Sequence, residues 1–366
     1  MSQSDMSQYD PFERGPHPVG VRTGEWTDAS RDRTLPVEIW YPASEAHRGE
    51  DLDEARCDRY KPMPMAPEVF QSAVRDGEAQ TGARPLIVFS HGFGGERRQT
   101  THLCTHWASH GYAVVAMDHV GNTALDMMQA AAAGGAATPA RQIAQFIVDR
   151  PADASFVIDR ALAGESGLEI DAERIGISGH SFGGWTTLAT TARDNRIRAA
   201  LPLAPAGGQT PLTPPGFAND MADALALTWE RPVETLYLVA EFDTLLPLDG
   251  MRDLHSRTPK PRRGVNLLNA DHFHFCDRVE QTHDLFKTLG PMMVGSVEGA
   301  PDMTEVLAGM KASAELCPGE HAYALLQGLG LAHMDACLKD DADARAFMAQ
   351  DLVGVMADRG VAVEML

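Results

Sequence analysis

The sequence predicts an α/β fold in which a mostly parallel central sheet is opened by an antiparallel N-terminal hairpin and carries helices on both faces. The main observation is that short apolar runs alternate with helical patterns from Pro85 onward, which is typical of βαβ units on a parallel sheet. Earlier in the chain, apolar and polar residues alternate over 35–41, as in a half-exposed antiparallel strand. A composition of 44% hydrophobic and 22% charged residues indicates a soluble globular protein with a sizeable core.

The expected elements follow from these patterns. Residues 18–26 and 35–41 form the N-terminal hairpin. Six apolar runs are the predicted parallel strands, namely residues 85–89, 113–117, 174–177, 199–203, 235–239 and 265–268. Predicted helices cover 101–110, 185–192 and 322–336, and a further helix opens at Pro151, because proline is favoured at the first helical position.

We expect the whole chain, 1–366, to form a single domain. Two insertions, 42–84 and 206–231, are placed near the pocket, and the first is expected to be a long surface excursion with little regular structure. The stretch 121–139, with its Ala/Gly-rich part 130–137, is predicted to be a loop beside the same pocket. Residues 291–366 are predicted to pack as a C-terminal helical layer of the same domain.

Net charge and cysteine content bear on the classes of binding partner and on the cellular compartment. With 31 basic and 51 acidic residues the formal charge is −20, which disfavours nucleic acid and anionic membrane surfaces as partners. No stretch reaches the roughly 18 apolar residues of a membrane span, and residues 1–10 do not resemble a secretory signal. The five cysteines are scattered and odd in number, so we expect a reduced, cytoplasmic protein. The sequence does not predict the oligomeric state.

The sharpest motif is Gly179-His180-Ser181-Phe182-Gly183, a G-x-S-x-G pattern between a predicted strand and a predicted helix. In a nucleophile elbow this turn lifts the serine hydroxyl above the carboxyl edge of the sheet. The turn is so tight that the residues two positions either side of the serine need to be glycine. The motif therefore predicts an α/β-hydrolase with Ser181 as nucleophile.

A serine hydroxyl needs a base, and in this fold an acid and then a histidine follow the nucleophile along the chain, each beyond a strand end. Asp243 follows the strand 235–239, and His272 follows the strand 265–268. We therefore predict a Ser181–His272–Asp243 triad, in which Asp243 fixes the imidazole tautomer. The nearest alternatives are Glu241 for the acid and His274 for the base.

The oxyanion of an acyl-transfer intermediate requires backbone N–H donors. One is predicted to be the N–H of Phe182, directly after the nucleophile, and the other that of Phe93 in the glycine-rich stretch 90–95 that follows a strand. A phosphate-binding loop is the alternative for this stretch, but no Walker-type or G-x-G-x-x-G pattern is present.

Other reactive residue types are interpreted as structural. His91, His119 and His180 are expected to be hydrogen-bonding scaffold residues, and Cys276 a small packed side chain. No H-E-x-x-H pattern or paired Cys/His spacing occurs, so no metal ion and no cofactor are expected.

Several motifs together resemble the bacterial branch of the platelet-activating factor acetylhydrolase and predicted dienelactone hydrolase group. The matching stretches are GPHPVGVR (15–22), LPVEIWYPA (35–43), FSHGFGG (89–95), DHVGNT (118–123), RPADASFVID (150–159), GHSFGG (179–184) and residues 272–277. The resemblance implies an α/β-hydrolase that uses Ser181 and His272 on acyl esters without a cofactor.

Two features depart from that group. Dienelactone hydrolases carry cysteine at the elbow, where this chain has Ser181. Animal plasma acetylhydrolases carry their acid just after the strand that follows the elbow helix, where this chain reads Leu203-Ala204-Pro205. The acid is therefore expected elsewhere, at Asp243, with Asp249 and Asp271 as the next candidates.

The expected function is hydrolysis of carboxylic esters of small to medium acyl groups through an acyl-enzyme, with a small-molecule ester as partner. An amidase or acyltransferase could use the same triad, because nucleophile and oxyanion hole do not reveal what leaves or what accepts the acyl group. A non-catalytic ligand-binding protein on the hydrolase scaffold is the third hypothesis.

Overall fold

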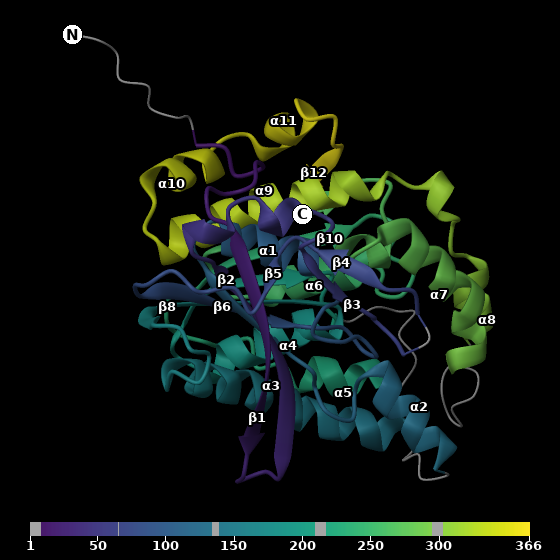
Figure 1. The fold of residues 1–366 in the computed structure, drawn as a ribbon. Coiled ribbons are helices and arrows are strands. Elements are labelled where there is room, and N and C mark those ends of the chain that lie inside the picture. The colour runs from purple at the N-terminus through teal and green to yellow at the C-terminus, as the bar shows by residue number, and fades with distance from the viewer. Residues whose placement is uncertain (1–8, 65, 134–138, 209–216, 295–302) are drawn as a thin grey trace.

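The computed structural model describes residues 9–64, 66–133, 139–208, 217–294 and 303–366, and these residues contain one large twisted sheet (Figure 1). From one edge to the other the sheet consists of β12 (Val363–Met365), β11 (Arg262–Leu267), β10 (Glu234–Ala240), β9 (Ile197–Leu203), β8 (Ile170–His180), β6 (Arg84–Ser90), β7 (Ala113–Met117), β2 (Arg33–Pro42), β1 (Val19–Asp28) and β5 (Val74–Arg75).

The strands β7, β6, β8, β9, β10 and β11 are mutually parallel, and each coincides with one of the six predicted runs. The hairpin β1–β2 is antiparallel, as predicted, and joins the sheet through β7. The expected fold class is therefore confirmed. Because the six strands are parallel, the segments that follow β6, β8, β10 and β11 all leave from the same edge of the sheet.

Helices cover both faces of the sheet (Figure 1). Helices α1 (Thr101–Ser109) and α9 (Gly319–Leu338) pack together on one face, and α3 (Pro139–Leu162) and α4 (Phe182–Arg193) pack together on the other. Helix α6 (Leu248–Arg257) contacts β10 and β11. The shorter or peripheral helices are α2 (Ala124–Ala132), α5 (Phe217–Asp223), α7 (Val279–Val294), α8 (Met303–Ala308), α10 (Ala342–Met348) and α11 (Leu352–Ala357).

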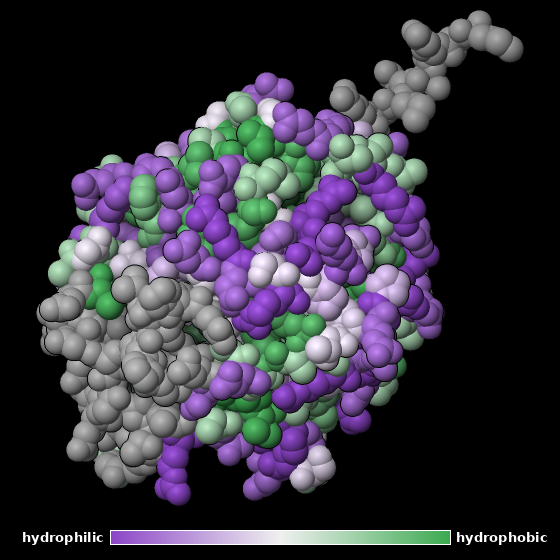
Figure 2. All heavy atoms as spheres, turned by 180° about the vertical axis from the view of Figure 1, so that it is seen from behind, coloured by the Kyte–Doolittle hydropathy of each residue, from purple (hydrophilic) through white to green (hydrophobic). Residues whose placement is uncertain are grey.

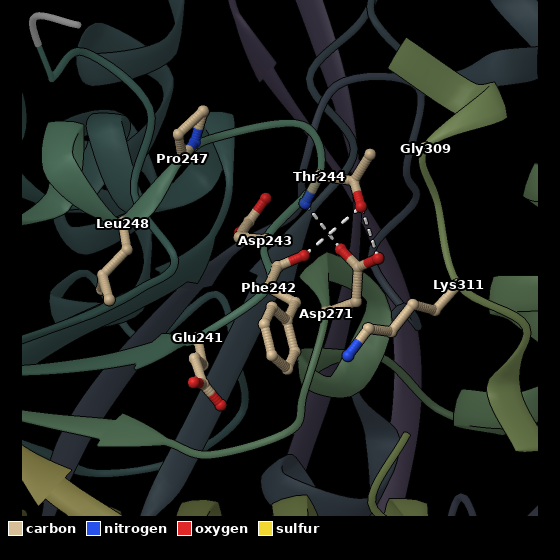
Figure 3. Close-up of a pocket in the computed structure, with 9 residues that line it drawn as sticks. All are labelled: Glu241, Phe242, Asp243, Thr244, Pro247, Leu248, Asp271, Gly309 and Lys311. Atoms are coloured by element: carbon tan, nitrogen blue, oxygen red, sulfur yellow. Dashed lines mark hydrogen bonds between the residues drawn. The ribbon is translucent and has the colours of Figure 1, made fainter. Parts of the chain in front are cut away.

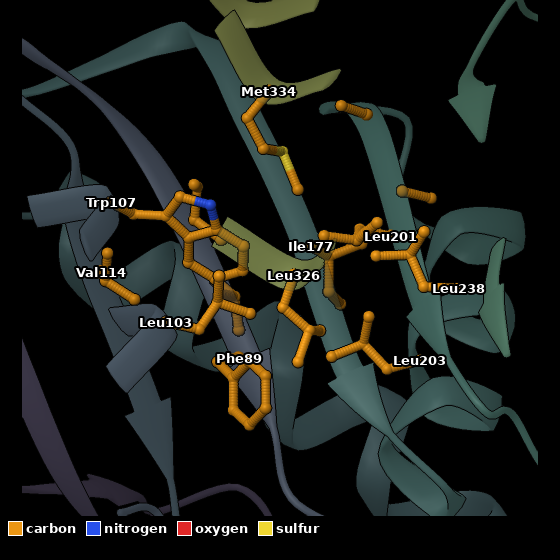
Figure 4. Close-up of a cluster of buried hydrophobic side chains, with 14 of the residues drawn as sticks. Phe89, Leu103, Trp107, Val114, Ile177, Leu201, Leu203, Leu238, Leu326 and Met334 are labelled. Atoms are coloured by element: carbon orange, nitrogen blue, oxygen red, sulfur yellow. The ribbon is translucent and has the colours of Figure 1, made fainter. Parts of the chain in front are cut away.

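Figure 4 shows the core between the sheet and the α1–α9 layer. Trp107 of α1 and Met334 of α9, both fully buried, lie over strand side chains. The strand residues labelled there are Phe89, Val114, Ile177, Leu201, Leu203 and Leu238. The contact with α9 is close, since a Cβ at Gly176 of β8 would lie 3.0 Å from the sulfur of Met334. The predicted C-terminal helical layer thus contributes directly to the core, but its last residues form the edge strand β12 rather than helix.

The expectation of a half-exposed strand at 35–41 is wrong. Both faces of β2 are buried from Val37 onward, because the excursion 42–84 folds over the polar face. Trp40 donates its indole N–H to Gln71 Oε1 at 2.6 Å, and the carboxylate of Glu38 pairs with Arg75 and Arg98, both at 2.9 Å. The excursion also has more regular structure than expected, including β5 and the pair β3 (Asp58–Tyr60) and β4 (Val69–Gln71).

The predicted helix start at Pro151 is also wrong, because α3 begins at Pro139 and continues through this proline. Ile143 and Phe146 lie upstream of Pro151, and both are buried. They extend the buried face formed by Ala154 and Val157 at helical spacing. Burial of this longer face outweighs the backbone hydrogen bond that Pro151 cannot donate.

The stretch predicted as a loop contains a helix, and so does the second insertion. Residues 124–132 of the expected loop 121–139 form α2, while 134–138 lie outside the described residues. The insertion 206–231 contains α5, and 209–216 lie outside the described residues. Met221, Leu225 and Leu227 of this insertion are buried, and the Met221 carbonyl accepts a hydrogen bond from Trp185 Nε1 of α4 at 2.8 Å.

The surface carries hydrophilic side chains interspersed with smaller hydrophobic groups, as the face in Figure 2 shows. Within the described part of the chain, no helix is long and apolar enough to cross a membrane.

The buried carboxylate of Glu38 yields a stability prediction. Its partners Arg75, Arg97 and Arg98 are mostly buried too. Glu38→Ala removes their shared anion: Arg98 then has no salt bridge among the described residues, whereas Arg75 keeps Asp58 and Arg97 keeps Asp118. We expect the free energy of unfolding to fall by about 3 kcal/mol, measured by urea denaturation. Glu173→Ala, which removes an exposed pair with Arg198, is the matched control and should change little. Equal losses in the two variants would contradict this account of Glu38.

Candidate active site

The turn after β8 places Ser181 at the start of α4 in a strained conformation. Its φ of 60° and ψ of −118° are sparsely populated for a residue with a side chain. The turn is fixed by backbone hydrogen bonds, in which Ser181 N–H donates to the Leu203 carbonyl at 2.9 Å and the Ser181 carbonyl accepts from Ala206 N–H at 3.0 Å. This is the backbone geometry expected of a nucleophile elbow.

The two glycines of the elbow are required by close packing against β6. A Cβ at Gly183 would lie 1.8 Å from the Ser90 carbonyl oxygen, and one at Gly179 would lie 2.5 Å from the same atom. Any side chain at either position would push the elbow away from the loop that begins at Ser90. The glycines therefore set the distance between Ser181 and the segment predicted to form the oxyanion hole.

That segment, residues 90–95, lies directly against the nucleophile. A Cβ at Gly92 would stand 3.3 Å from Ser181 Cβ. Among the described residues the N–H of Phe93 has no hydrogen-bond acceptor, whereas the next two N–H groups are bonded, Gly94 to Asn122 O and Gly95 to Gly92 O. The N–H of Phe182 lies in the first turn of α4, where no intrahelical acceptor exists. Both predicted donors are thus available to a ligand.

His272 and Asp243 meet at the ends of β11 and β10. Nδ1 of His272 and Oδ2 of Asp243 are 2.8 Å apart, and both side chains are buried. The other oxygen of Asp243 accepts from the N–H groups of Leu245 and Leu246, at 3.1 and 2.7 Å. Burial raises the pKa of Asp243, and the hydrogen bond from His272 opposes that rise. Because the carboxylate accepts from Nδ1, the other ring nitrogen, Nε2, carries the lone pair, and it has no hydrogen-bond partner among the described residues.

The alternatives to these two residues have other partners. Glu241 accepts a hydrogen bond from the backbone N–H of Asn269 at 2.8 Å, and His274 Nε2 donates to the Cys317 carbonyl at 3.0 Å. Asp271 connects the loops of Asp243 and His272. It accepts from Thr244 N and Thr244 Oγ1 at 2.8 and 2.6 Å (Figure 3), and it also accepts from His272 N at 2.6 Å.

His180 links the elbow to the base loop. Its ring lies 4.5 Å from that of His272, centroid to centroid, and its Nε2 donates to the His272 carbonyl at 3.0 Å. Gln99 accepts from Gly92 N–H and donates to His180 Nδ1, both at 2.8 Å. Burial keeps the pKa of His180 well below its usual value, so this ring stays neutral. It serves as a scaffold, as expected, and the sequence analysis missed the part played by Gln99.

A second set of hydrogen-bonded serine, histidine and aspartate side chains is buried next to the 90–95 loop; it consists of Ser90, His119 and Asp153 and is called the buried string below. His119 contacts Ser90 Oγ through Nε2 at 2.9 Å and Asp153 Oδ2 through Nδ1 at 3.0 Å. Burial lowers the pKa of His119 to about 4, and the hydrogen bonds of His119 and Arg33 hold the pKa of Asp153 at about 2 despite burial. Ser90 has no exposed surface, so this string cannot reach a substrate.

A pocket of about 300 Å³ opens beside the acid loop (Figure 3). It is lined by Glu241, Phe242, Asp243, Thr244, Pro247, Leu248, Asp271, Gly309 and Lys311. The ammonium of Lys311 lies 3.3 Å from the centroid of the Phe242 ring. In the part of the chain that the structure describes, no cluster of three or more His, Cys, Asp or Glu side chains could hold a metal ion.

Comparison with known proteins adds relatives of modest similarity. The bovine (Bos taurus) platelet-activating factor acetylhydrolase is 28% identical over 170 residues, which cover 37% of either chain. Cutinase est2 of Thermobifida alba is 28% identical over 195 residues, covering 51% of this chain and 52% of that one. The quorum-quenching protein AidA of Acinetobacter baumannii is 32% identical over 191 residues, covering 51% and 53%. The match therefore spans about half or less of each relative's length.

Among solved structures, a ferulic acid esterase from Streptomyces cinnamoneus superposes with a TM-score of 0.63 over 89% of this chain and 92% of that chain. At 24% identity this likeness shows a shared fold. The family model described as serine aminopeptidase, S33, matches residues 81–273, a stretch that contains Ser181, Asp243 and His272. Because that match covers more than half of the 366 residues, the chain belongs to the serine aminopeptidase S33 family of hydrolases.

Proposed function

We propose that the protein is a serine carboxylic ester hydrolase that works through an acyl-enzyme, with Ser181 as nucleophile, His272 as general base and Asp243 as the acid. The observation that carries the proposal is the 2.8 Å contact between His272 Nδ1 and Asp243 Oδ2 at the sheet edge that also carries the strained Ser181. A buried acid–imidazole pair next to a serine elbow is the constellation that activates a hydroxyl for acyl transfer.

The chemistry follows from this geometry. Nε2 of His272 takes the proton of Ser181 Oγ as that oxygen attacks the ester carbonyl, and Asp243 stabilises the imidazolium that forms. The N–H groups of Phe93 and Phe182 donate to the oxyanion of the tetrahedral intermediate. His272 then protonates the leaving alkoxide, and a water molecule activated by the same imidazole releases the acid from Ser181.

The proposed substrate class is supported by the similar proteins and by the side chains around the site. The relatives named above include an acetylhydrolase and a cutinase, and the structural neighbour is a ferulic acid esterase, which together support ester cleavage. Phe93 is 46% exposed, and the Met127 methyl of α2 would contact a Cβ at Gly94, so the loop offers an apolar edge next to the donors. We infer small to medium acyl esters as substrates.

Amide cleavage is the second candidate, because the family model is described as an aminopeptidase. Turnover of a panel of nitrophenyl esters and nitroanilides of increasing acyl length separates the two and reports the acyl preference.

A cytoplasmic location is proposed because all five cysteines are unpaired, which fits a reducing compartment.

The nucleophile is tested with Ser181→Ala. Turnover should fall by roughly four to six orders of magnitude while the circular dichroism spectrum and thermal midpoint stay those of the wild type. Stoichiometric labelling by a fluorophosphonate, followed by intact-protein mass spectrometry, should disappear in the same variant. Substantial turnover or labelling of Ser181→Ala would refute the assignment.

The acid is tested by a matched pair of isosteric changes. Asp243→Asn lets Nδ1 of His272 accept a hydrogen bond and so favours the wrong tautomer, and kcat should fall by about 10⁴. Glu241→Gln is the control, because among the described residues the Glu241 side chain bonds only to the Asn269 N–H, and its effect on kcat should be far smaller. A crippled Glu241→Gln together with a near-silent Asp243→Asn would reverse the assignment.

A further inference from the structure

Arg150 is a fully buried cation on the inner face of α3. Among the described residues its guanidinium makes hydrogen bonds only to neutral groups: Thr186 Oγ1 at 2.9 Å, Ser90 Oγ at 3.1 Å, Asn122 Oδ1 and the His91 carbonyl. Burying a charge without a directly paired counter-charge is costly, so an arginine at this position calls for a functional reason.

Asp153 carries the negative charge that acts on Arg150, but its carboxylate is hydrogen-bonded to other residues. Asp153 accepts hydrogen bonds from Arg31 and Arg33, at 2.7 to 3.0 Å, and contacts His119 at 3.0 Å. Its negative charge is therefore already shared by two other guanidinium groups. The positive charge of Arg150 remains largely uncompensated inside the protein.

The partners of Arg150 belong to both halves of the proposed oxyanion hole. Ser90 and His91 begin the loop that carries Phe93, and the backbone carbonyl of Asn122 accepts from Gly94 N–H, directly after Phe93, at 3.1 Å. On the other side, the guanidinium carbon of Arg150 lies 4.5 Å from the centroid of the Phe182 ring. One side chain thus contacts the segments that supply both backbone donors.

We propose that Arg150 is a positioning residue of the oxyanion hole, and that its buried positive charge stabilises the negative charge of the tetrahedral intermediate. The inference rests on the esterase function proposed above. Arg150 does not touch the substrate: it holds the His91 carbonyl and the Phe182 ring, and its field acts on the oxyanion through an interior that screens charge poorly. Burial lowers the pKa of Arg150 to about 9, so the group keeps its charge near neutral pH.

The decisive variant is Asn122→Asp. Asn122 is fully buried, its Oδ1 accepts from Arg150, and its amide nitrogen has no partner among the described residues. An aspartate at position 122 therefore keeps the oxygen that accepts from Arg150 and places a negative charge beside the guanidinium, without removing a hydrogen bond seen in the structure. If Arg150 only filled space in the core, this change would leave kcat unaltered.

We expect Asn122→Asp to retain or raise the thermal midpoint, to lower kcat by about 10 to 10²-fold and to leave KM nearly unchanged, because the field matters only when the oxyanion forms. Inhibition by phenylboronic acid, which forms an anionic tetrahedral adduct with the nucleophilic serine, should weaken by a similar factor.

Arg150→Met, which removes the charge, should lose about 10²-fold in kcat, and Arg150→Lys, which keeps it, should lose less.

Asn195→Asp is the matched control. The Oδ1 atom of Asn195 accepts from Arg231 Nη1 at 3.3 Å on the exposed side of the protein, beyond the C-terminal end of α4, so the same change adds a charge beside an arginine outside the site, and kcat should stay within about threefold of the wild type. If Asn122→Asp is stably folded and keeps wild-type kcat and boronate affinity, the role of Arg150 is refuted while the esterase proposal stands. If the wild-type protein neither cleaves esters nor reacts with a fluorophosphonate, the proposed function fails first, and the role of Arg150 fails with it.

Discussion

The contact on which the site depends is the one between the elbow and the end of β6. Parallel pairing of β6 with β8 brings Ser90 opposite Gly179, and the two glycines of the elbow leave room for the Ser90 carbonyl where a side chain would collide with it. This contact sets the strained backbone of Ser181 against the loop of Phe93. Ser181 and the two proposed oxyanion donors are therefore positioned by one packing constraint rather than by separate ones.

The second half of the site is assembled by short loops that bond to one another. β10 and β11 are neighbours, and Asp271 joins their loops through Thr244 and the His272 N–H. Asp243 then uses one carboxylate oxygen for the backbone of its own loop and the other, Oδ2, for His272. A hydrogen bond from His180 to the His272 carbonyl connects this half to the elbow, and the His180 ring packs against the imidazole that bonds to Asp243.

Much of this arrangement could be predicted from the sequence, because it depends on local patterns. The six parallel strands are marked by apolar runs, and the elbow by glycines at fixed offsets from Ser181. Features that depend on distant segments could not be predicted. The polar face of β2 is buried by the excursion 42–84, and α3 runs through Pro151 because its buried face extends upstream. For Arg150 the sequence contains one usable signal: it is a charged residue on the same helical face as the buried Phe146 and Ala154.

The buried string of Ser90, His119 and Asp153 shows why residue types alone do not identify the nucleophile. It has the same kinds of contact as a catalytic triad, with distances of 2.9 and 3.0 Å. Yet Ser90 lies at the end of a regular strand without exposed surface, whereas Ser181 is half-buried in a strained turn at the sheet edge. Reactivity follows from access and backbone geometry, and the elbow glycines encode that geometry in the sequence. A search for serine, histidine and aspartate would find both strings, but only the glycines distinguish them.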